Sequence, residues 1–469
     1  MDDRLYLVGV LFFGIFLHSL FLDSHFDRDE GFILTVGWGV NEGKVLYKDF
    51  FEFKPPAGHY TAALVYPVFG HNLTYYRLFI LAVNLGSAII IYNIGRLLWS
   101  AKTGLIASFL FLLGVPLFEG NKFFSEVFIV FFSGLGLFYY LRYLDSERKS
   151  HIFYAGFFYG MAVLYKQVAL LLLVGVVIHL LVSKKRLHPI ILFSLGAILP
   201  AVFFTIYFIK AGALGIAFES LVSIFGRYKP NTLAEFLLYL RRDFIAIPLL
   251  WILIISSFLP LARKKFSFKI DGAVYMQFIL TLPPILFKQF PHYYIPAIAF
   301  GSLLAGKSLI ELTGVYYQFL GRFWGRLLFV SVVFILLAPS FARLHEDYLI
   351  QKESKPLENY VLASKFIREN TSPGDKILVI AKEAQIHFLS ERFAPTKYYF
   401  IDYSTHYPGI EEYLISESEK SGVKYYIAFE NPYLKEYTGV VYEHILENAV
   451  LVKEYPQRYA IKIYARKSS

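Results

Sequence analysis

The chain has 469 residues, of which 56% are hydrophobic and 19% aromatic, and its formal net charge is +10. Apolar runs recur at the length of a membrane-spanning helix, which excludes an ordinary soluble core and predicts an α-helical polytopic membrane protein. A membrane surface attracts basic residues, so the positive charge does not require nucleic acid as a partner. Cysteine is absent, which excludes disulfides and thiolate metal sites.

The sequence predicts about eleven membrane-spanning helices, because roughly 20 apolar residues cross the hydrocarbon core of a bilayer. Spans three to six are short, and their division along the chain is open. Acidic residues flank the first span and no small-residue cleavage site follows it, so we expect an anchor and not a cleaved signal peptide. The predicted spans are residues 6–22, 73–97, 103–117, 127–141, 152–165, 168–182, 189–209, 244–261, 273–287, 294–312 and 327–341.

Basic residues follow every even-numbered span, which indicates that the even connections are cytoplasmic and the odd connections face outward. Two odd connections are basic as well, but long functional loops can break this rule, and acids offset the bases in the first loop. The basic residues of the even connections are Arg96, Lys102, Arg148, Lys149, Lys184, Lys185, Arg186, Arg263, Lys264, Lys265, Arg322 and Arg326. Those of the odd connections are Lys44, Lys48, Lys54, Arg227, Lys229, Arg241 and Arg242.

The first loop (residues 23–72) is the densest polar stretch beside the predicted membrane, where charge is costly unless it is used. Helix-like spacing of apolar residues predicts a surface helix from Gly31 to Asn41, with Gly43 as its stop. The Pro55–Pro56 pair predicts the start of a second short helix that runs toward Pro67. The loop therefore holds its carboxylates and lysines on rigid, membrane-apposed pieces.

After Phe341 the composition changes to that of a soluble fold. The pattern predicts helices at 359–369 and 410–421 and strands at 376–381, 424–429, 450–455 and 459–464. We expect residues 1–344 to form the membrane domain and residues 345–469 to form an extracytoplasmic α/β domain. In the α/β domain we recognise no set of residues arranged for catalysis.

Several short motifs follow one another in an order typical of one enzyme family. In sequence and loop placement the chain resembles the GT-C membrane glycosyltransferases, specifically the bacterial and archaeal relatives of protein O-mannosyltransferases and aminoarabinose transferases. The resemblance implies transfer of a sugar from a polyprenyl-phosphate carrier to a hydroxyl of a protein, lipid or glycan acceptor, at the outer face of the cytoplasmic membrane. The motifs are 27–31, 46–51, 54–56, Arg77, 125–126, 166–167 and 292–294.

Such a transfer needs a base that takes the proton of the acceptor hydroxyl. We expect Asp29 to be this base, with Asp27 and Glu30 as supporting neighbours. The alternative is that this acidic cluster only caps the helix at Gly31. Glu126, which opens span four, is a candidate second acid, and its alternative role is likewise to stabilise a helix start.

The leaving phosphate needs cations. The candidates are Lys54, Arg77 and Lys166, although an isolated lysine between two spans can also simply extend toward the interface. His292 and Tyr293 are candidate substrate-binding residues, and tyrosine is also ordinary at a membrane interface.

No cofactor is required by these candidates. A divalent metal ion could be held by His292 together with Glu52 or His59, but no tight ligand spacing supports such a site.

Two other classes of function remain open. A lipid-linked sugar flippase or another transporter would place ionisable residues within spans or show repeated halves, whereas here the carboxylates concentrate in one loop. A receptor with a membrane anchor would not need so many spans.

Overall fold

The structure is a computed structural model, and it describes residues 3–184, 187–223, 230–259, 268, 271–320, 322–354, 358–401, 409–429, 438–456 and 460–467. Contacts divide the chain into two compact units. Unit 1 comprises Met1–Ser24, Thr74–Tyr207 and Phe225–Ile350, and unit 2 comprises His25–Leu73, Phe208–Ile224 and Gln351–Ser469. The chain thus enters unit 2 three times. The boundary at residue 344 between the membrane domain and the α/β domain is based on the sequence alone and stays a prediction.

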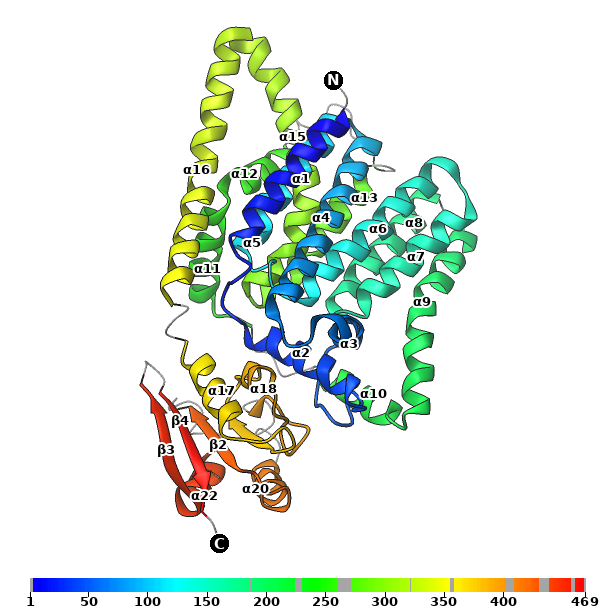
Figure 1. Ribbon diagram of the computed structural model, residues 1–469. Coiled ribbons are helices and arrows are strands. Elements are labelled where there is room, and N and C mark those ends of the chain that lie inside the picture. The colour runs from blue at the N-terminus through cyan, green and yellow to red at the C-terminus, as the bar shows by residue number, and fades with distance from the viewer. Residues whose placement is uncertain are drawn as a thin grey trace. The chain divides into compact units, whose positions relative to one another are not determined.

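Unit 1 is helical (Figure 1). Among the described residues, five helical stretches are long and apolar enough to cross a membrane, as expected of a membrane protein: Leu73–Leu98, Ser125–Ser146, Leu187–Lys210, Pro291–Gly314 and Phe323–Glu353. The helices are α1 (Asp3–Ser19), α4 (Leu73–Leu98), α5 (Ala101–Leu117), α6 (Ser125–Ser146), α7 (Lys149–Val163), α8 (Leu170–Lys184), α9 (Leu187–Lys210), α11 (Leu233–Ala246), α12 (Pro248–Ser257), α13 (Asp271–Leu280), α14 (Leu282–Phe287), α15 (Ile295–Leu320) and α16 (Arg322–Ser354).

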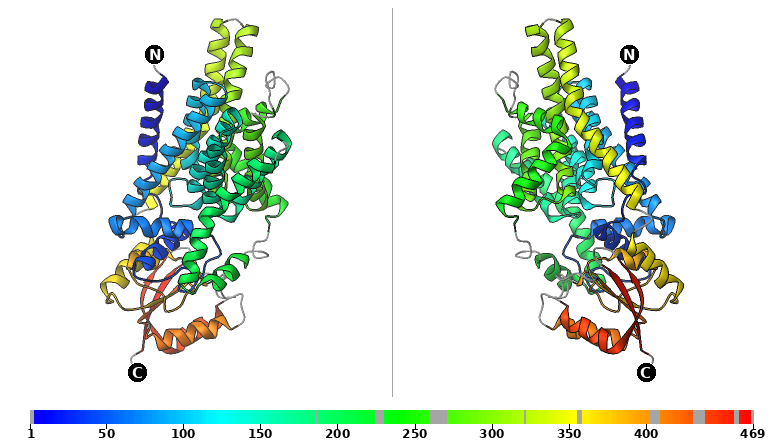
Figure 2. Two further views of the ribbon diagram at one scale, coloured as in Figure 1. Left: turned by 90° about the vertical axis from the view of Figure 1, so that its right-hand side faces the viewer. Right: turned by 90° about the vertical axis from the view of Figure 1, so that its left-hand side faces the viewer.

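The predicted span 273–287 lies within the apolar helical stretch Asp271–Phe287, whose regular hydrogen bonding is interrupted. It is broken at Thr281 between α13 and α14, and prolines stand in the first turn of α14. A proline ring lacks the amide donor and collides with the carbonyl four residues earlier, so Pro283 and Pro284 cannot continue α13 but can begin a new helix. Elsewhere in unit 1, α15 and α16 form the two arms of a helical hairpin (Figure 2).

Two sets of polar contacts join connections of unit 1. Trp99, after the second predicted span, donates from Nε1 to Oδ1 of Asp271 at 2.7 Å, and Nζ of Lys307 lies 3.4 Å from the same oxygen. At an odd-numbered connection, Asn121 donates to Oγ of Ser24 at 2.7 Å. Several basic residues used above for orientation lie outside the described residues, namely Lys185, Arg186, Arg227, Lys229, Arg263, Lys264 and Lys265.

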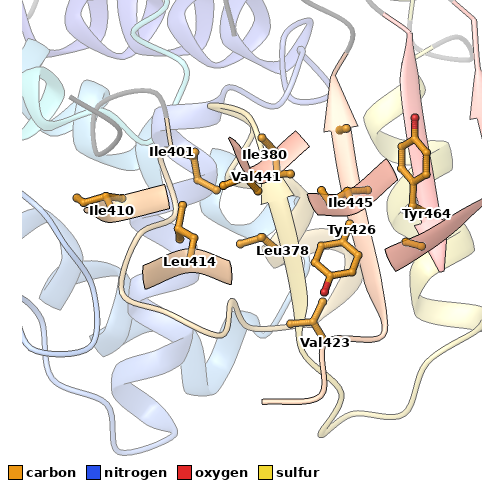
Figure 3. Close-up of a cluster of buried hydrophobic side chains, with 12 residues drawn as sticks. Leu378, Ile380, Ile401, Ile410, Leu414, Val423, Tyr426, Val441, Ile445 and Tyr464 are labelled. Atoms are coloured by element: carbon orange, nitrogen blue, oxygen red, sulfur yellow. The ribbon is translucent and has the colours of Figure 1, made fainter. Parts of the chain in front are cut away.

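Unit 2 contains a four-stranded sheet in the order β1-β2-β4-β3, in which β1 and β2 are parallel and the other pairs antiparallel. One face of the sheet packs against α20 and α22 through Leu378, Tyr426, Leu414 and Ile445 (Figure 3). The elements are α2 (Arg28–Asn41), α3 (Ala57–Phe69), α10 (Leu214–Val222), α17 (Asn359–Glu369), β1 (Ile377–Ile380), α18 (Gln385–Ser390), α20 (Ile410–Lys420), β2 (Tyr425–Phe429), α22 (Gly439–Asn448), β3 (Ala449–Tyr455) and β4 (Ile461–Arg466).

Within unit 2 the first loop packs on the chain that follows β1. The rings of Trp38 and Phe393 stack with centroids 3.7 Å apart, and Phe32 lies 4.9 Å from the ring of Phe400. The amide of Phe51 donates to the carbonyl of residue 397 at 2.7 Å. Aromatic pairs of this kind contribute roughly 0.5–1.5 kcal/mol each beyond the area they bury. The two segments therefore fold as one unit despite more than 300 intervening residues.

Gly31 is where this packing is tightest. A Cβ atom at this position would lie 2.4 Å from Cβ and 2.5 Å from Cα of Gln385. The helices α2 and α18 can therefore approach this closely only because residue 31 has no side chain. We expect Gly31→Ala to lower the stability of unit 2 by about 1–3 kcal/mol, the usual cost of overpacking. Thermal unfolding in detergent would measure the loss. Gly374→Ala is the matched control, because nothing lies within 4 Å of its Cβ; equal melting points for the two variants would contradict this packing.

Candidate active site

The first turn of α2 carries the acidic cluster, and its members have different partners. Asp27 is the N-cap residue, and its Oδ1 accepts a hydrogen bond from the amide of Asp29 at 2.8 Å. Asn and Asp are the preferred residues at this position because their side chains satisfy free amides of the first turn. Glu30 is fully buried. The side chain of Asp29 is 32% exposed, and its carboxylate lies 3.2 Å from Nζ of Lys54.

The position of Lys54 is fixed by its own backbone contacts. Its carbonyl accepts a hydrogen bond from the hydroxyl of Tyr47 at 2.9 Å, and its amide donates to Oε1 of Glu52 at 3.0 Å. Tyr47 is completely buried and has a φ of 70°, an uncommon conformation for a residue other than glycine. The lysine side chain is only 13% exposed. The loop thus holds a cation directly beside the Asp29 carboxylate.

A buried acid–imidazole pair supports this loop. Nε2 of His59, on the first turns of α3, lies 3.1 Å from Oε2 of Glu52, and both side chains are at most 3% exposed. Burial raises the pKa of the Glu52 carboxyl, but the positive charge of Lys54 and the contact with His59 outweigh it, and the pKa lies below its ordinary value. Within the described ranges, no three histidine, aspartate or glutamate side chains gather as a possible metal site.

A second group of candidate residues lies in unit 1. Glu126 begins α6 as predicted and forms a buried ion pair with Lys166, which precedes a short 3-10 helix (Gln167–Ala169). The ammonium of Lys166 also lies 3.9 Å from the centre of the Tyr293 ring, a cation–π contact. A narrow, mostly apolar pocket adjoins them and is lined by Glu126, Ile129, Val168, Ala169, Leu172, Leu280, Thr281, Pro284, Tyr293 and Pro296.

Glu119 joins this group, although sequence reasoning missed it. Its carboxylate lies 2.9 Å from Nζ of Lys122 and 3.6 Å from Nδ1 of His292. Burial opposes its ionisation, but His292 and Lys122 outweigh burial and hold the pKa of Glu119 at about 2. The available signal was the polar stretch 119–122 between two apolar spans. The first loop was identified by the same kind of signal, a longer polar stretch beside predicted membrane spans.

Arg77 supports the same stretch and is almost completely buried. Its guanidinium donates to the carbonyl of Asn121 at 3.1 Å, and Asn84 donates to the carbonyl of Gly120 at 2.8 Å. The candidates thus form two groups, each within one unit. Unit 1 brings together Arg77, Glu126, Lys166, His292 and Tyr293, and unit 2 brings together Asp27, Asp29, Glu30, Glu52, Lys54 and His59.

The chain is similar to one protein family in sequence. Residues 53–208 match the family model of dolichyl-phosphate-mannose-protein mannosyltransferases. This range contains Lys54, Arg77, Glu126 and Lys166 but not Asp29. No curated protein sequence matches the chain at a significant level.

Solved structures share its fold over nearly the whole chain. ArnT from Cupriavidus metallidurans, crystallised with undecaprenyl phosphate, matches with a TM-score of 0.67 over 98% of this chain and 97% of that one, at 14% identity. The apo Archaeoglobus fulgidus oligosaccharyltransferase matches with a TM-score of 0.62 over 98% and 74%, at 12% identity. AglB from the same organism, with an inhibitory peptide and a dolichol-phosphate, gives a TM-score of 0.56 over 99% and 74%, at 12% identity. The predicted resemblance is confirmed as a likeness of fold.

Proposed function

From a fold shared with the GT-C membrane glycosyltransferases, we propose that this chain transfers a sugar from a polyprenyl-phosphate donor to an acceptor hydroxyl. The observation that carries the proposal is the pairing of Asp29 with Lys54 at the start of α2. A partly exposed carboxylate beside a nearly buried cation supplies both groups that the reaction needs. The carboxylate accepts a proton, and the cation binds an anionic leaving group.

In the proposed step, the acceptor oxygen attacks the anomeric carbon of the sugar. The O–H proton passes to the Asp29 carboxylate, a bond forms between the acceptor oxygen and the anomeric carbon, and the bond from that carbon to the phosphate oxygen breaks. The polyprenyl phosphate leaves with the bonding electron pair, and Lys54 stabilises its negative charge. Asp27 contributes by capping α2 and holding the backbone of Asp29 in place.

For Lys166, which lies in unit 1, we propose separately a contact with the phosphate of a polyprenyl-phosphate lipid. It lies in a buried ion pair beside a mostly apolar pocket, so a charged head and an apolar tail both find suitable neighbours there. The undecaprenyl phosphate in the ArnT crystal and the dolichol-phosphate in the AglB complex are ligands of this kind. Tyr293 contacts this lysine and His292 contacts Glu119, which supports a substrate-binding role for both residues as well.

The function is tested with purified protein in liposomes supplied with radiolabelled polyprenyl-phosphate sugars and a panel of protein, lipid and glycan acceptors. A transferase converts the donor into free polyprenyl phosphate and a labelled acceptor. A flippase, the alternative class, moves labelled donor to the opposite leaflet and leaves it intact. Movement without consumption of any donor would overturn the proposal.

We also propose that the first loop and residues 345–469 face the outside of the cytoplasmic membrane. Single cysteines at the exposed positions Glu42, Ser372 and Ser150 test this, in a chain with no thiol of its own. An impermeant maleimide applied to whole cells should label Glu42→Cys and Ser372→Cys but not Ser150→Cys, which lies in an even-numbered connection. Labelling of Ser150→Cys alone would show that the chain has the opposite orientation in the membrane.

A further inference from the structure

Glu52 holds the backbone of the segment that carries Lys54. Its Oε1 accepts hydrogen bonds from the amide of Phe53 at 2.8 Å and from the amide of Lys54 at 3.0 Å. Hydrogen bonds to an ionised acceptor are stronger than those between neutral groups, so two of them on one oxygen define the course of the chain here. The carbonyl of Lys54 is held as well, by the hydroxyl of Tyr47 at 2.9 Å. The lysine side chain therefore starts from a fixed backbone.

The other oxygen of this carboxylate faces His59. Nε2 of His59 lies 3.1 Å from Oε2 of Glu52, and the two side chains are 2% and 3% exposed. A carboxylate removed from water is costly unless it is paired, so the imidazole supplies a partner that the buried acid needs. Burial raises the pKa of Glu52, but the charge of Lys54 and the contact with His59 outweigh it, and the acid stays ionised.

The imidazole of His59 also contacts the helix that carries Asp29. Its ring meets the ring of Phe32 edge to face, with centroids 5.8 Å apart. Phe32 and Asp29 stand three residues apart in α2, and residues at this spacing are neighbours on one side of a helix. The buried acid–imidazole pair thus ties the backbone of Lys54 to the helix that presents the Asp29 carboxylate. The ammonium of Lys54 meets that carboxylate at 3.2 Å.

We propose that Glu52 and His59 are positioning residues, which hold the ammonium of Lys54 where it meets both the Asp29 carboxylate and the phosphate of the donor. The inference rests on the proposed function. Both side chains are almost completely buried, so they act on the substrate through Lys54 and not by contact with it. A group misplaced by about 1 Å can lower a rate by about 10²-fold, so a small displacement of the lysine should be measurable.

His59→Phe and His59→Gln test this role. Phenylalanine keeps a ring against Phe32 but offers Oε2 of Glu52 no donor, whereas the glutamine amide can replace Nε2 as a donor. We expect His59→Phe to lower kcat/KM for a short-chain polyprenyl-phosphate sugar by about 10–100-fold, the equivalent of one hydrogen bond to a charged group. His59→Gln should recover most of the lost activity. Rates are expressed per folded protein, and binding of labelled donor is measured in parallel.

A double-mutant cycle shows whether the histidine acts through the lysine. Lys54→Met removes the ammonium, so adding His59→Phe to that variant should cause almost no further loss of donor binding. Residues that act independently would give losses that multiply. If His59→Phe does not fold, Glu52→Gln replaces it in the cycle, because its amide oxygen still accepts both backbone amides while the negative charge opposite His59 is gone.

Ile445→Ala is the matched control for a simple loss of stability in unit 2. Ile445 is completely buried in the core that packs the sheet against α20 and α22. The variant should lower the melting temperature and leave kcat/KM per folded protein unchanged. Wild-type donor binding in a folded His59→Phe protein, or an equal loss with and without the Lys54 ammonium, would overturn the inference while the transfer activity stands. Absence of transfer by the wild-type protein with every donor would refute the proposed function itself.

Discussion

Replacing Asp29 with asparagine should lower the rate of sugar transfer by about 10²–10⁴-fold, the usual contribution of a general base. The amide has the shape and polarity of the carboxylate but accepts no proton, so donor binding should persist. Single-turnover kinetics with saturating labelled donor, together with a separate binding measurement, would distinguish the lost chemical step from lost affinity. Near-normal turnover in a folded Asp29→Asn protein would contradict the assignment.

Asp27 provides the matched comparison two residues away. Its side chain caps α2, and asparagine caps helices as well as aspartate does, so Asp27→Asn should retain most of the activity. Asp27→Ala should cost about 0.5–2 kcal/mol of stability through the lost cap. If Asp27→Asn or Glu30→Gln abolishes transfer while Asp29→Asn does not, the catalytic carboxylate lies elsewhere in this turn. If all three variants are active, the first turn of α2 is not the catalytic site.

The second large effect should come from the buried pair of Glu126 and Lys166. Lys166→Met removes the principal partner of the buried Glu126 carboxylate, and breaking a buried ion pair in this way typically costs about 3–5 kcal/mol. The cation–π contact with Tyr293 is lost as well. Thermal or denaturant unfolding in detergent would measure this loss. Lys420→Met removes one partner of an exposed pair on α20 and should leave stability essentially unchanged.

A double variant separates stability from substrate binding at this pair. Glu126→Gln combined with Lys166→Met removes both charges, and replacing a whole buried pair is often nearly neutral for stability. We therefore expect the double variant to recover the stability lost in Lys166→Met but to remain impaired in donor binding. Full recovery of both properties would show that the lysine only neutralises Glu126.

Local signals in the sequence placed several elements to within a few residues. The helix at 359–369 was predicted with the bounds of α17, and the predicted strands at 376–381 and 424–429 contain β1 and β2. In the first loop, the Pro55–Pro56 pair correctly marked the start of α3. Caps, prolines and periodicity act over a few residues, so a single sequence displays them. The predicted total of eleven spans stays a prediction.

Contacts between distant residues left no such signal. Glu126 and Lys166 were each singled out, but nothing in the sequence pairs two charges 40 positions apart. Gln385 was passed over as well, because only the packing of α18 on α2 brings it against Gly31. The break at Thr281 is different, because Pro283 and Pro284 could have revealed it.

Unit 2 is built from three separate segments of the chain, which constrains the order in which it can fold during synthesis. Residues 25–73 leave the ribosome early, but the surface on which Phe32 and Trp38 pack, at residues 393–400, is synthesised more than 300 residues later. Contacts between such distant segments form slowly, and exposed apolar surface invites misassembly in the meantime. A chain that stops before β1 would keep its membrane helices yet leave α2 uncovered. Packing around α2 therefore cannot be completed until residues 385–400 have been synthesised.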